Sequence, residues 1–386
     1  MGGMTAATAP WTDRTDLIAL AERLEARFVG GAVRDSLLGQ AVADIDLATP
    51  LSPETVIARV REAGFKPVPT GIAHGTITAV LPDGPVEVTT LRRDVSTDGR
   101  HAVVAFTDDW REDAARRDFT MNALYADPVT AELFDYFGGL DDLKAGRVRF
   151  IGDPLQRIAE DHLRILRFFR FHARFGQAID QAGLEACTQR ANDLMALSRE
   201  RIAAELLKLL VAARAVPVVA LMVEQGIFRA VIPEIDRAGA DRLARLAEAE
   251  AAAGIAPDPI RRLAALLPPE VAEPVGARLK LSNLDRKRLI AATAGPGDEG
   301  PHALAYRVGT TGAVDRLLLA GESVAAIRDW TPPALPLTGG ALVERGVRKG
   351  PDVARLLRQV ETRWIAEGFP DADRVAELAD AAVAQA

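Results

Sequence analysis

The stretch that decides the fold of this chain covers residues 29–50 and reads VGGAVRDSLLGQAVADIDLATP. An apolar strand runs into the pair Gly30 and Gly31, which predicts a tight turn followed by a short helix. Near the end of the stretch, Asp44 and Asp46 flank one isoleucine. Because residues two apart in a strand point to the same face, these two carboxylates should project together. Two ionised carboxylates so placed need a cation.

Mg²⁺ suits such a pair, since it takes one or two protein carboxylates and fills its shell with water and substrate phosphate. A third acid, Glu87, lies in the segment VEVTTLR, where Val86 and Val88 face one way and Glu87 the other. Three carboxylates could hold two Mg²⁺ ions about 3.5 to 4 Å apart, the arrangement that catalyses nucleotidyl transfer. A bare Asp-x-Asp is more often two solvent-facing residues at a strand edge, so its context decides.

That context is a set of phosphate-binding residue types near the acids. Backbone N–H groups at a glycine turn and a helix start favour anions, so this turn can hold a triphosphate. The segment RRDFTMNAL (116–124) adds forked guanidinium groups, which bond well to phosphate. Without the upstream motifs, a charged helix start that pairs with itself would explain this segment better. The candidate nucleotide contacts are Gly30, Gly31, Arg34, Arg116, Arg117, Asp118 and Asn122.

The segment EDHLRILRFFRFHARFG (160–176) bears on base selection. On one helix, Asp161 and Arg164 would share a face and present an acceptor beside donors. Cytosine and adenine match that order of groups, whereas uracil and guanine invert it. Arg167 and Arg170 continue a positive face that is suited to RNA and triphosphate. The alternative for the pair Asp161 and Arg164 is an exposed salt bridge of small energy. The phenylalanines between the arginines are expected to lie in the core.

Composition bounds the class of protein. The chain has 386 residues, 48% of them hydrophobic, and a single cysteine, which excludes an internal disulfide. No stretch approaches the length of a membrane helix, so we expect no membrane partner and a cytoplasmic location. The net charge of -7 and pI near 5.5 argue against whole-surface attraction to nucleic acid and leave a local basic groove open. Residues 1–10 are expected to be a disordered leader.

Periodicity predicts an α+β protein. Up to about residue 150, short alternating runs such as GTITAVL and VEVTTLR are joined by turns, with a helix beginning after Ser52. Beyond residue 150 the spacing of apolar residues is helical.

Together these motifs closely resemble the class II CCA-adding enzymes (tRNA nucleotidyltransferases), which share a head with bacterial poly(A) polymerases. The resemblance is specific over residues 25–210 and weaker beyond. It implies a polymerase-β-like nucleotidyltransferase head followed by helical neck, body and tail. The expected segments are a leader and helix (1–24), head (25–145), neck (146–212), body (213–300) and tail (301–386).

The resemblance also implies the reaction. The acids Asp44, Asp46 and Glu87 would hold two Mg²⁺ ions, and the RNA 3'-hydroxyl would attack the α-phosphate of CTP or ATP. The pair Asp161 and Arg164 would act as an amino-acid template for the base, with the neighbouring Glu160 bracing Arg164. The partners are tRNA and the two nucleotides, with no DNA.

Two further segments carry expectations from the family. The loop around Asp98, Gly99 and Arg100 is needed in relatives for the switch to the final A, so its presence favours full CCA addition. In the tail, a basic cluster before a Gly-Pro helix start is a candidate contact to the tRNA backbone. Its members are Arg345, Arg348 and Lys349.

Alternatives remain within and outside the family. A poly(A) polymerase or an A-adding specialist would use the same head motifs. A noncatalytic RNA-binding helical protein should have lost a metal carboxylate, and all three are present. A metal phosphohydrolase is disfavoured because none of the five histidines is followed by aspartate.

Overall fold

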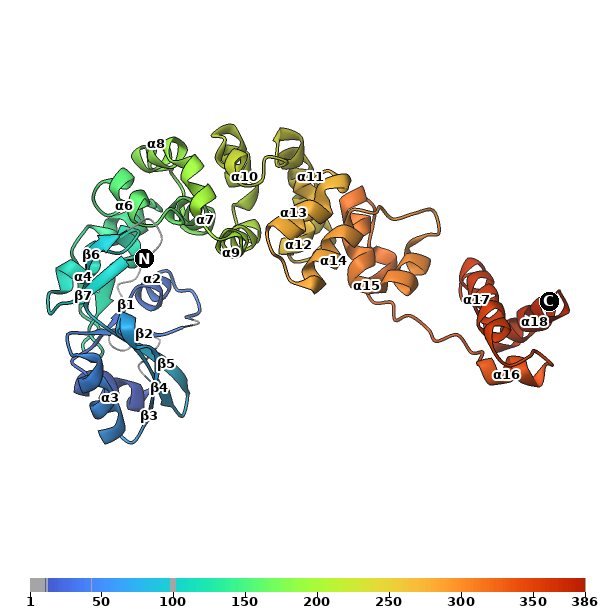
Figure 1. The fold of residues 1–386 in the computed structure, drawn as a ribbon, viewed down its shortest axis with the longest axis horizontal. Helices are drawn as coiled ribbons and strands as arrows, with labels where there is room; N and C mark the ends of the chain where they lie inside the picture. The colour runs from blue at the N-terminus through green and yellow to red at the C-terminus, as the bar shows by residue number, and fades with distance from the viewer. Residues whose placement is uncertain (1–10, 12, 43, 98–101, 386) are drawn as a thin grey trace. The chain divides into compact units, whose positions relative to one another are not determined.

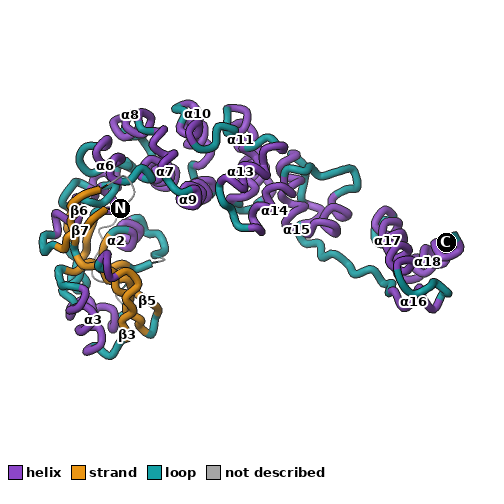
Figure 2. The backbone as a smooth tube through the Cα atoms, in the orientation of Figure 1, coloured by secondary structure: helices purple, strands orange, loops and turns teal. Residues whose placement is uncertain are grey.

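The computed structural model of the chain describes residues 11, 13–42, 44–97 and 102–385. It divides into two compact units, Met1–Pro233 and Glu234–Ala386. The strands of the described residues all lie in the first unit, and the second is helical (Figure 2). This confirms the predicted fold class of a mixed sheet followed by helices. The five predicted segments divide the chain more finely than these two units.

The first unit is built on a mixed seven-stranded sheet (Figure 1). Its strand order is β3-β4-β5-β2-β1-β8-β9, and β2 and β5 form its parallel pair. The strands are β1 (Arg27–Val29), β2 (Asp46–Thr49), β3 (Lys66–Gly71), β4 (Thr76–Leu81), β5 (Gly84–Thr90), β8 (Leu124–Ala126) and β9 (Leu133–Asp135).

A second, two-stranded sheet pairs β6 (Arg92–Thr97) with β7 (Ala102–Phe106) in antiparallel fashion. It flanks the loop that was expected to matter for the final A. The residues of that loop, Asp98 to Arg100, lie outside the described part of the chain.

Local sequence rules explain the helices around the sheet. In α3 (Pro53–Glu62), the Ser52 side chain accepts a hydrogen bond from the Thr55 amide, and Val56 and Val60 are buried. This confirms the predicted helix. The other helices here are α1 (Thr15–Arg23), α2 (Gly31–Leu37), η1 (Ile72–His74), α4 (Trp110–Ala115), η2 (Thr120–Asn122) and α5 (Gly139–Lys144).

The rest of the first unit is helical, as predicted. The α7 phenylalanines Phe168, Phe169 and Phe171 are buried, which confirms them as core residues. Helix α10 packs against α7 and so joins the first unit. The elements are α6 (Pro154–Glu160), α7 (Arg164–Phe175), α8 (Gln181–Gln189), η3 (Ala191–Ala196), α9 (Arg199–Leu210), α10 (Ala215–Glu224) and η4 (Ile227–Ala230).

One helix prediction was wrong. Asp161 and Arg164 were expected on a continuous helix, but Asp161 has an extended backbone, with φ -149° and ψ 106°, and ends α6. Its carboxylate accepts a hydrogen bond from the Leu163 amide at 3.1 Å. An aspartate side chain that bonds to a nearby backbone amide competes with helical hydrogen bonding. Helix α7 then starts afresh at Arg164.

The second unit consists of helices, one of which is kinked. In α15, Gly309 has φ 79° and ψ 157°, outside the helical region. No helix in the described part of the chain is long and apolar enough to span a bilayer. The helices are α11 (Arg237–Ala253), α12 (Pro259–Leu266), η5 (Pro269–Val271), α13 (Ala272–Arg278), α14 (Asn283–Ala292), α15 (Pro301–Ala320), η6 (Ala325–Ile327), α16 (Gly339–Glu344), α17 (Pro351–Ala366) and α18 (Ala372–Ala384).

Candidate active site

The sheet places two of the predicted acids side by side. Asp46, the first residue of β2, is the parallel partner of Glu87 in β5. Val86 and Val88 on either side of Glu87 are fully buried while Glu87 is exposed, as the alternation predicted. Asp44 lies just before β2 and is also exposed. All three carboxylates line one pocket of about 560 Å³.

The electrostatics of this pocket favour a cation. Burial raises the pKa of Asp46, and the neighbouring charge of Glu87 raises it further, while Arg117 opposes the shift and Asp44 adds to it. The three carboxylates make no hydrogen bond or ion pair with any other described residue, so their charge is left uncompensated at close range.

Oxygen donors of this kind fit a hydrated divalent metal ion. Among the residues that the structure describes, no group of three acidic, histidine or cysteine side chains is closed around a metal-sized point. Mg²⁺ does not need such a cage, because it is commonly bound through one or two carboxylates together with water and substrate phosphates. The neighbouring Asp46 and Glu87, with Asp44 on the same pocket wall, meet that requirement.

The glycine turn lies next to the second motif. Gly30 has φ 67°, a left-handed conformation that side chains rarely adopt, and it immediately precedes α2. A Cβ atom at Gly30 would lie 3.4 Å from Nη1 of Arg117 and 3.5 Å from the Asn122 carbonyl oxygen. Gly31 likewise faces Arg34, whose Nη2 is 3.8 Å from the corresponding point. The turn and the second motif are therefore in direct contact.

The arginines of the second motif are held by an acid that sequence reasoning did not single out. Buried Asp113 bonds to Arg116 at 3.0 Å and to Arg117 at 3.1 Å, and accepts a hydrogen bond from the Tyr125 hydroxyl at 2.7 Å. Burial opposes ionisation, but Arg117 and Arg116 hold the pKa of Asp113 at about 2. The spacing was the available signal, since Asp113 stands one helical turn before both arginines.

A second network joins α2, η2 and α7. The Arg34 side chain donates to Asn122 Oδ1 at 2.5 Å, and Asn122 Nδ2 donates to Asp118 Oδ1 at 2.8 Å. Arg167 donates to Asp118 Oδ2 through Nε at 2.8 Å. Burial disfavours the charge of Asp118, but the facing Arg167 lowers its pKa overall. The structure thus brings together four of the predicted nucleotide contacts, and these four bond to one another.

Arg34 has a further partner that the sequence did not reveal. Its Nε donates to Asp35 at 2.8 Å, and its guanidinium stacks over the Phe175 ring at 4.4 Å. Asp35 is also 3.3 Å from Arg174 of α7. These contacts fix α2 against the first helices beyond the sheet.

The two residues expected to read the base have separate partners. Arg164 is nearly buried and donates to Glu160 at 2.6 Å and to the Arg116 carbonyl at 2.9 Å. Asp161 is half-buried and pairs with Arg201 of α9, at 3.0 and 2.8 Å to its two oxygens. The expected bracing of Arg164 by Glu160 is present.

The positive face predicted for α7 is largely neutralised. Arg170 bonds to Glu205 at 2.5 Å, and Arg167 lies 3.8 Å from the same carboxylate. Arg201 and Glu205 of α9 therefore pair with residues of other segments. These arginines therefore serve as rigid donors with fixed positions.

The basic cluster of the tail belongs to the second unit. Arg345 is bonded to Asp380 at 2.7 Å and to the Ala341 carbonyl at 3.0 Å. Arg348 and Lys349 are exposed just before α17. Only the latter two present unengaged charge among the described residues of this cluster.

Comparison with known proteins decides the family. A family model described as "Poly A polymerase head domain" matches residues 26–149, and one described as "Probable RNA and SrmB- binding site of polymerase A" matches residues 176–238. The human "CCA tRNA nucleotidyltransferase 1, mitochondrial" is 37% identical over 379 residues, covering 90% of this chain and 84% of the human protein. The chain belongs to the CCA tRNA nucleotidyltransferase family.

Other members of this family match this chain over part of its sequence or share its fold. A "CCA-adding enzyme" of Anoxybacillus flavithermus is 39% identical over 213 residues, or 55% of this chain and 52% of that protein. The Bacillus stearothermophilus CCA-adding enzyme, solved in complex with CTP, superposes with a TM-score of 0.70 at 26% identity, covering 96% of this chain and 98% of that one. The Thermotoga maritima enzyme complexed with tRNA, at 19% identity and a TM-score of 0.71, shares the fold across 97% of this chain and 95% of that chain.

Proposed function

We propose that this chain adds or repairs the 3'-terminal CCA of tRNA by nucleotidyl transfer from CTP and ATP. The observation that carries the proposal is the parallel register of Asp46 and Glu87, because it puts two uncompensated carboxylates beside the glycine turn and Arg117. The likeness to CCA tRNA nucleotidyltransferases over most of the chain supports the substrate.

The acids would hold two Mg²⁺ ions. When bound, the ions would lower the pKa of the RNA 3'-hydroxyl and balance the charge of the triphosphate. Asp44, Asp46 and Glu87 supply oxygen ligands on one pocket wall. Burial and, after it, the charge of Glu87 raise the pKa of Asp46, and a bound cation would offset both by favouring the ionised carboxylate.

The remaining site residues would hold and select the nucleotide. Arg116 and Arg117 present guanidinium groups that are already oriented by Asp113, so little conformational entropy is lost when phosphate binds. Arg34, Asp118 and Asn122 form the buried support under this turn, together with Arg167. Gly30 keeps a side chain out of the space beside Arg117, and Gly31 faces Arg34.

Base selection would rest on Asp161 and Arg164. Arg164 is braced by Glu160, and Asp161 is braced by Arg201, so acceptor and donor both have fixed positions. An acceptor beside donors matches cytosine and adenine. Arg170, whose charge is balanced by Glu205, would offer the nucleotide a hydrogen-bond donor of fixed position. Arg348 and Lys349, with Arg345 nearby in sequence, would contact the tRNA backbone.

We also propose the cellular compartment of the protein and the completion of the reaction to the final A. The single, buried cysteine supports a reducing compartment such as the cytoplasm. Full CCA addition is proposed because the sequence contains the loop residues Asp98, Gly99 and Arg100, which lie outside the described part of the chain.

The test uses the purified chain, Mg²⁺ and three transcripts of one tRNA, ending before CCA, after C and after CC. With CTP and ATP together, each transcript should be extended to CCA and no further. Addition of A only to the CC-ended transcript would instead identify an A-adding specialist. A long ladder of A would identify a poly(A) polymerase, which the name of the matched head model keeps as the second candidate. No incorporation would contradict the proposal.

A further inference from the structure

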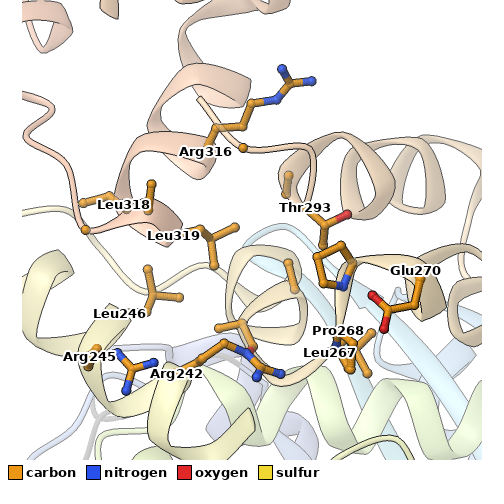
Figure 3. A pocket seen from close by; sticks show the side chains of 17 residues that line it. Arg242, Arg245, Leu246, Leu267, Pro268, Glu270, Thr293, Arg316, Leu318 and Leu319 are labelled. Atoms are coloured by element: carbon orange, nitrogen blue, oxygen red, sulfur yellow. The ribbon is translucent and has the colours of Figure 1, made fainter. Parts of the chain in front are cut away.

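A pocket in the second unit lies outside the proposed active site. It has a volume of about 550 Å³ and is walled by α11, α12, α15 and the segment that follows α14 (Figure 3). Small-molecule sites typically measure about 300 to 1,000 Å³, so one drug-sized ligand would fit.

One side of this pocket is cationic. Arg242 and Arg245 of α11 lie on this side, while Arg316 of α15 and the acid Glu270 line other parts of the pocket (Figure 3). The three arginines and one glutamate give a local charge of +2 in a chain with a net charge of -7. Opposite charge in a ligand would therefore be attracted here.

The guanidinium groups are only partly satisfied by the protein. The Arg242 Nε donates to the Ala265 carbonyl at 2.8 Å, which fixes the side chain, while its Nη2 is buried and has no hydrogen-bond partner. Arg245 is exposed and makes no ion pair within the described part of the chain. A buried donor left unpaired costs free energy, which a bound anion would recover.

The floor of the pocket is apolar and its far edge can accept hydrogen bonds. Leu246, Leu267 and Leu318 are buried beneath this floor, and the apolar surface open to a ligand comes from the partly exposed Leu319 and Pro268 (Figure 3). At this edge the Glu270 carboxylate has no ion-pair partner among the described residues. A ligand that fills the pocket needs an anionic end, a flat apolar body and a hydrogen-bond donor.

We propose that this pocket binds a nucleotide unit, meaning a phosphate joined to a nucleobase that carries an amino group. Arg242 and Arg245 take the phosphate, the leucine and proline wall takes the face of the base, and Glu270 accepts from the amino group. The unit comes either from a free nucleoside monophosphate or from an unpaired nucleotide of an RNA. The binding does not depend on catalysis in the first unit.

The test follows the methyl NMR signals of Leu246, Leu318 and Leu319 in the full chain, without Mg²⁺. Addition of AMP should shift these signals, whereas inosine monophosphate, which lacks the amino group, should bind several-fold more weakly. Arg245→Gln should weaken AMP binding about tenfold or more, as expected for the loss of a charged hydrogen-bond donor. Arg237→Gln, on the same helix but outside the pocket, should leave AMP binding unchanged.

The source of the nucleotide is settled by a second titration. If an RNA nucleotide is the ligand, a tRNA transcript shifts the same methyl signals and AMP competes with it; if a free nucleotide is the ligand, only AMP shifts them. Either result supports the pocket. The proposal is overturned if AMP shifts none of these signals, if inorganic phosphate binds as well as AMP, or if Arg245→Gln and Arg237→Gln behave alike. Because binding is read without turnover, these outcomes stand apart from any failure of CCA addition.

Discussion

The acids on the sheet and the arginines on α7 carry opposite charges. They also differ in whether the protein gives them a bonded partner. Asp44, Asp46 and Glu87 have no bonded partner in the described part of the chain. By contrast, Arg164 and Arg167 are each bonded to a carboxylate. The acids keep their charge for a ligand that arrives, whereas the arginines are fixed before it arrives.

This difference fits the roles that we propose for the two sets. A metal ion brings its own charge, so pre-paired acids would have to be released before they could bind it. A guanidinium that must offer a donor at one place loses less entropy on binding when it is already held. Substitutions in the acids therefore test the need for a negative charge that binds metal. Substitutions that affect the arginines test the need for donors held in fixed positions.

Removing one acid should have the largest effect. Asp46→Asn keeps the shape of the side chain but removes the charge that would bind Mg²⁺, so the rate of nucleotide addition should fall about a thousandfold or more. Affinity for tRNA, measured by filter binding, should stay the same. Asp83→Asn, which lines the same pocket from an exposed position, is the matched control. Normal turnover in Asp46→Asn would contradict the metal assignment.

Breaking the support of the paired arginines should cost stability as well as activity. Asp113→Asn leaves Arg116 and Arg117 without their buried acid, and loss of one partner from such a pair costs about 3 to 5 kcal/mol. Urea unfolding of the first unit should shift to lower concentration, and the KM for CTP should rise. Asp141→Asn, at an exposed surface pair, should change neither. An unchanged unfolding curve for Asp113→Asn would show that the arginines are held by other contacts.

A smaller and more selective effect is expected at Arg201. Because it acts through Asp161, Arg201→Ala should lower the preference for CTP over UTP about three- to tenfold, with little change in the rate of pyrophosphate release per correct addition. Competition assays with both nucleotides measure this ratio. Lys208→Ala, on the same helix and exposed, is the control. Equal selectivity in both variants would show that the Arg201–Asp161 pair supports the fold and has no part in nucleotide choice.

An effect on stability alone, with no change in nucleotide choice, is expected from His172 on the buried side of α7. Burial, helped by nearby Arg214, lowers the pKa of His172 from 6.5 to about 4. The unfolded chain therefore binds a proton between these values that the folded chain does not, so stability is full above about pH 6.5 and declines as pH falls toward 4. His172→Gln should flatten this part of the stability curve. A wild-type curve that is already flat from pH 7 to 4.5 would argue that His172 titrates normally.

Sequence predicted most of what is local. The helix after Ser52, the hairpin of β4 and β5, and the outward direction of Glu87 all follow from periodicity and turn chemistry and are confirmed. The continuous helix through Asp161 failed because one side-chain hydrogen bond to the Leu163 amide outweighs helical propensity. Helix propensity does not tell in advance at which aspartate the side-chain hydrogen bond will outweigh the helix.

Contacts between distant segments could not be predicted from one sequence. Arg201 pairs with Asp161, and Glu205 with Arg170, across a helix that lies between them in the chain. Periodicity indicates which face of a helix is polar but not which partner meets it. The family resemblance supplied roles for Asp161 and Arg164 and named Glu160 as the support of Arg164, but it did not name Arg201 as the support of Asp161. Asp113 is the exception, because its spacing to Arg116 and Arg117 was visible.

The parallel register of β2 and β5 has a consequence for folding. In the chain, α3, β3 and β4 lie between β2 and β5. Asp46 and Glu87 therefore become neighbours only once β5 pairs with β2 in the sheet. A slip of one residue would put Val86 or Val88 in the place of Glu87 and turn the acid toward the core. The time at which nucleotide addition returns during refolding should therefore report when β2 and β5 pair. A chain with its helices formed but these strands unpaired would have no activity.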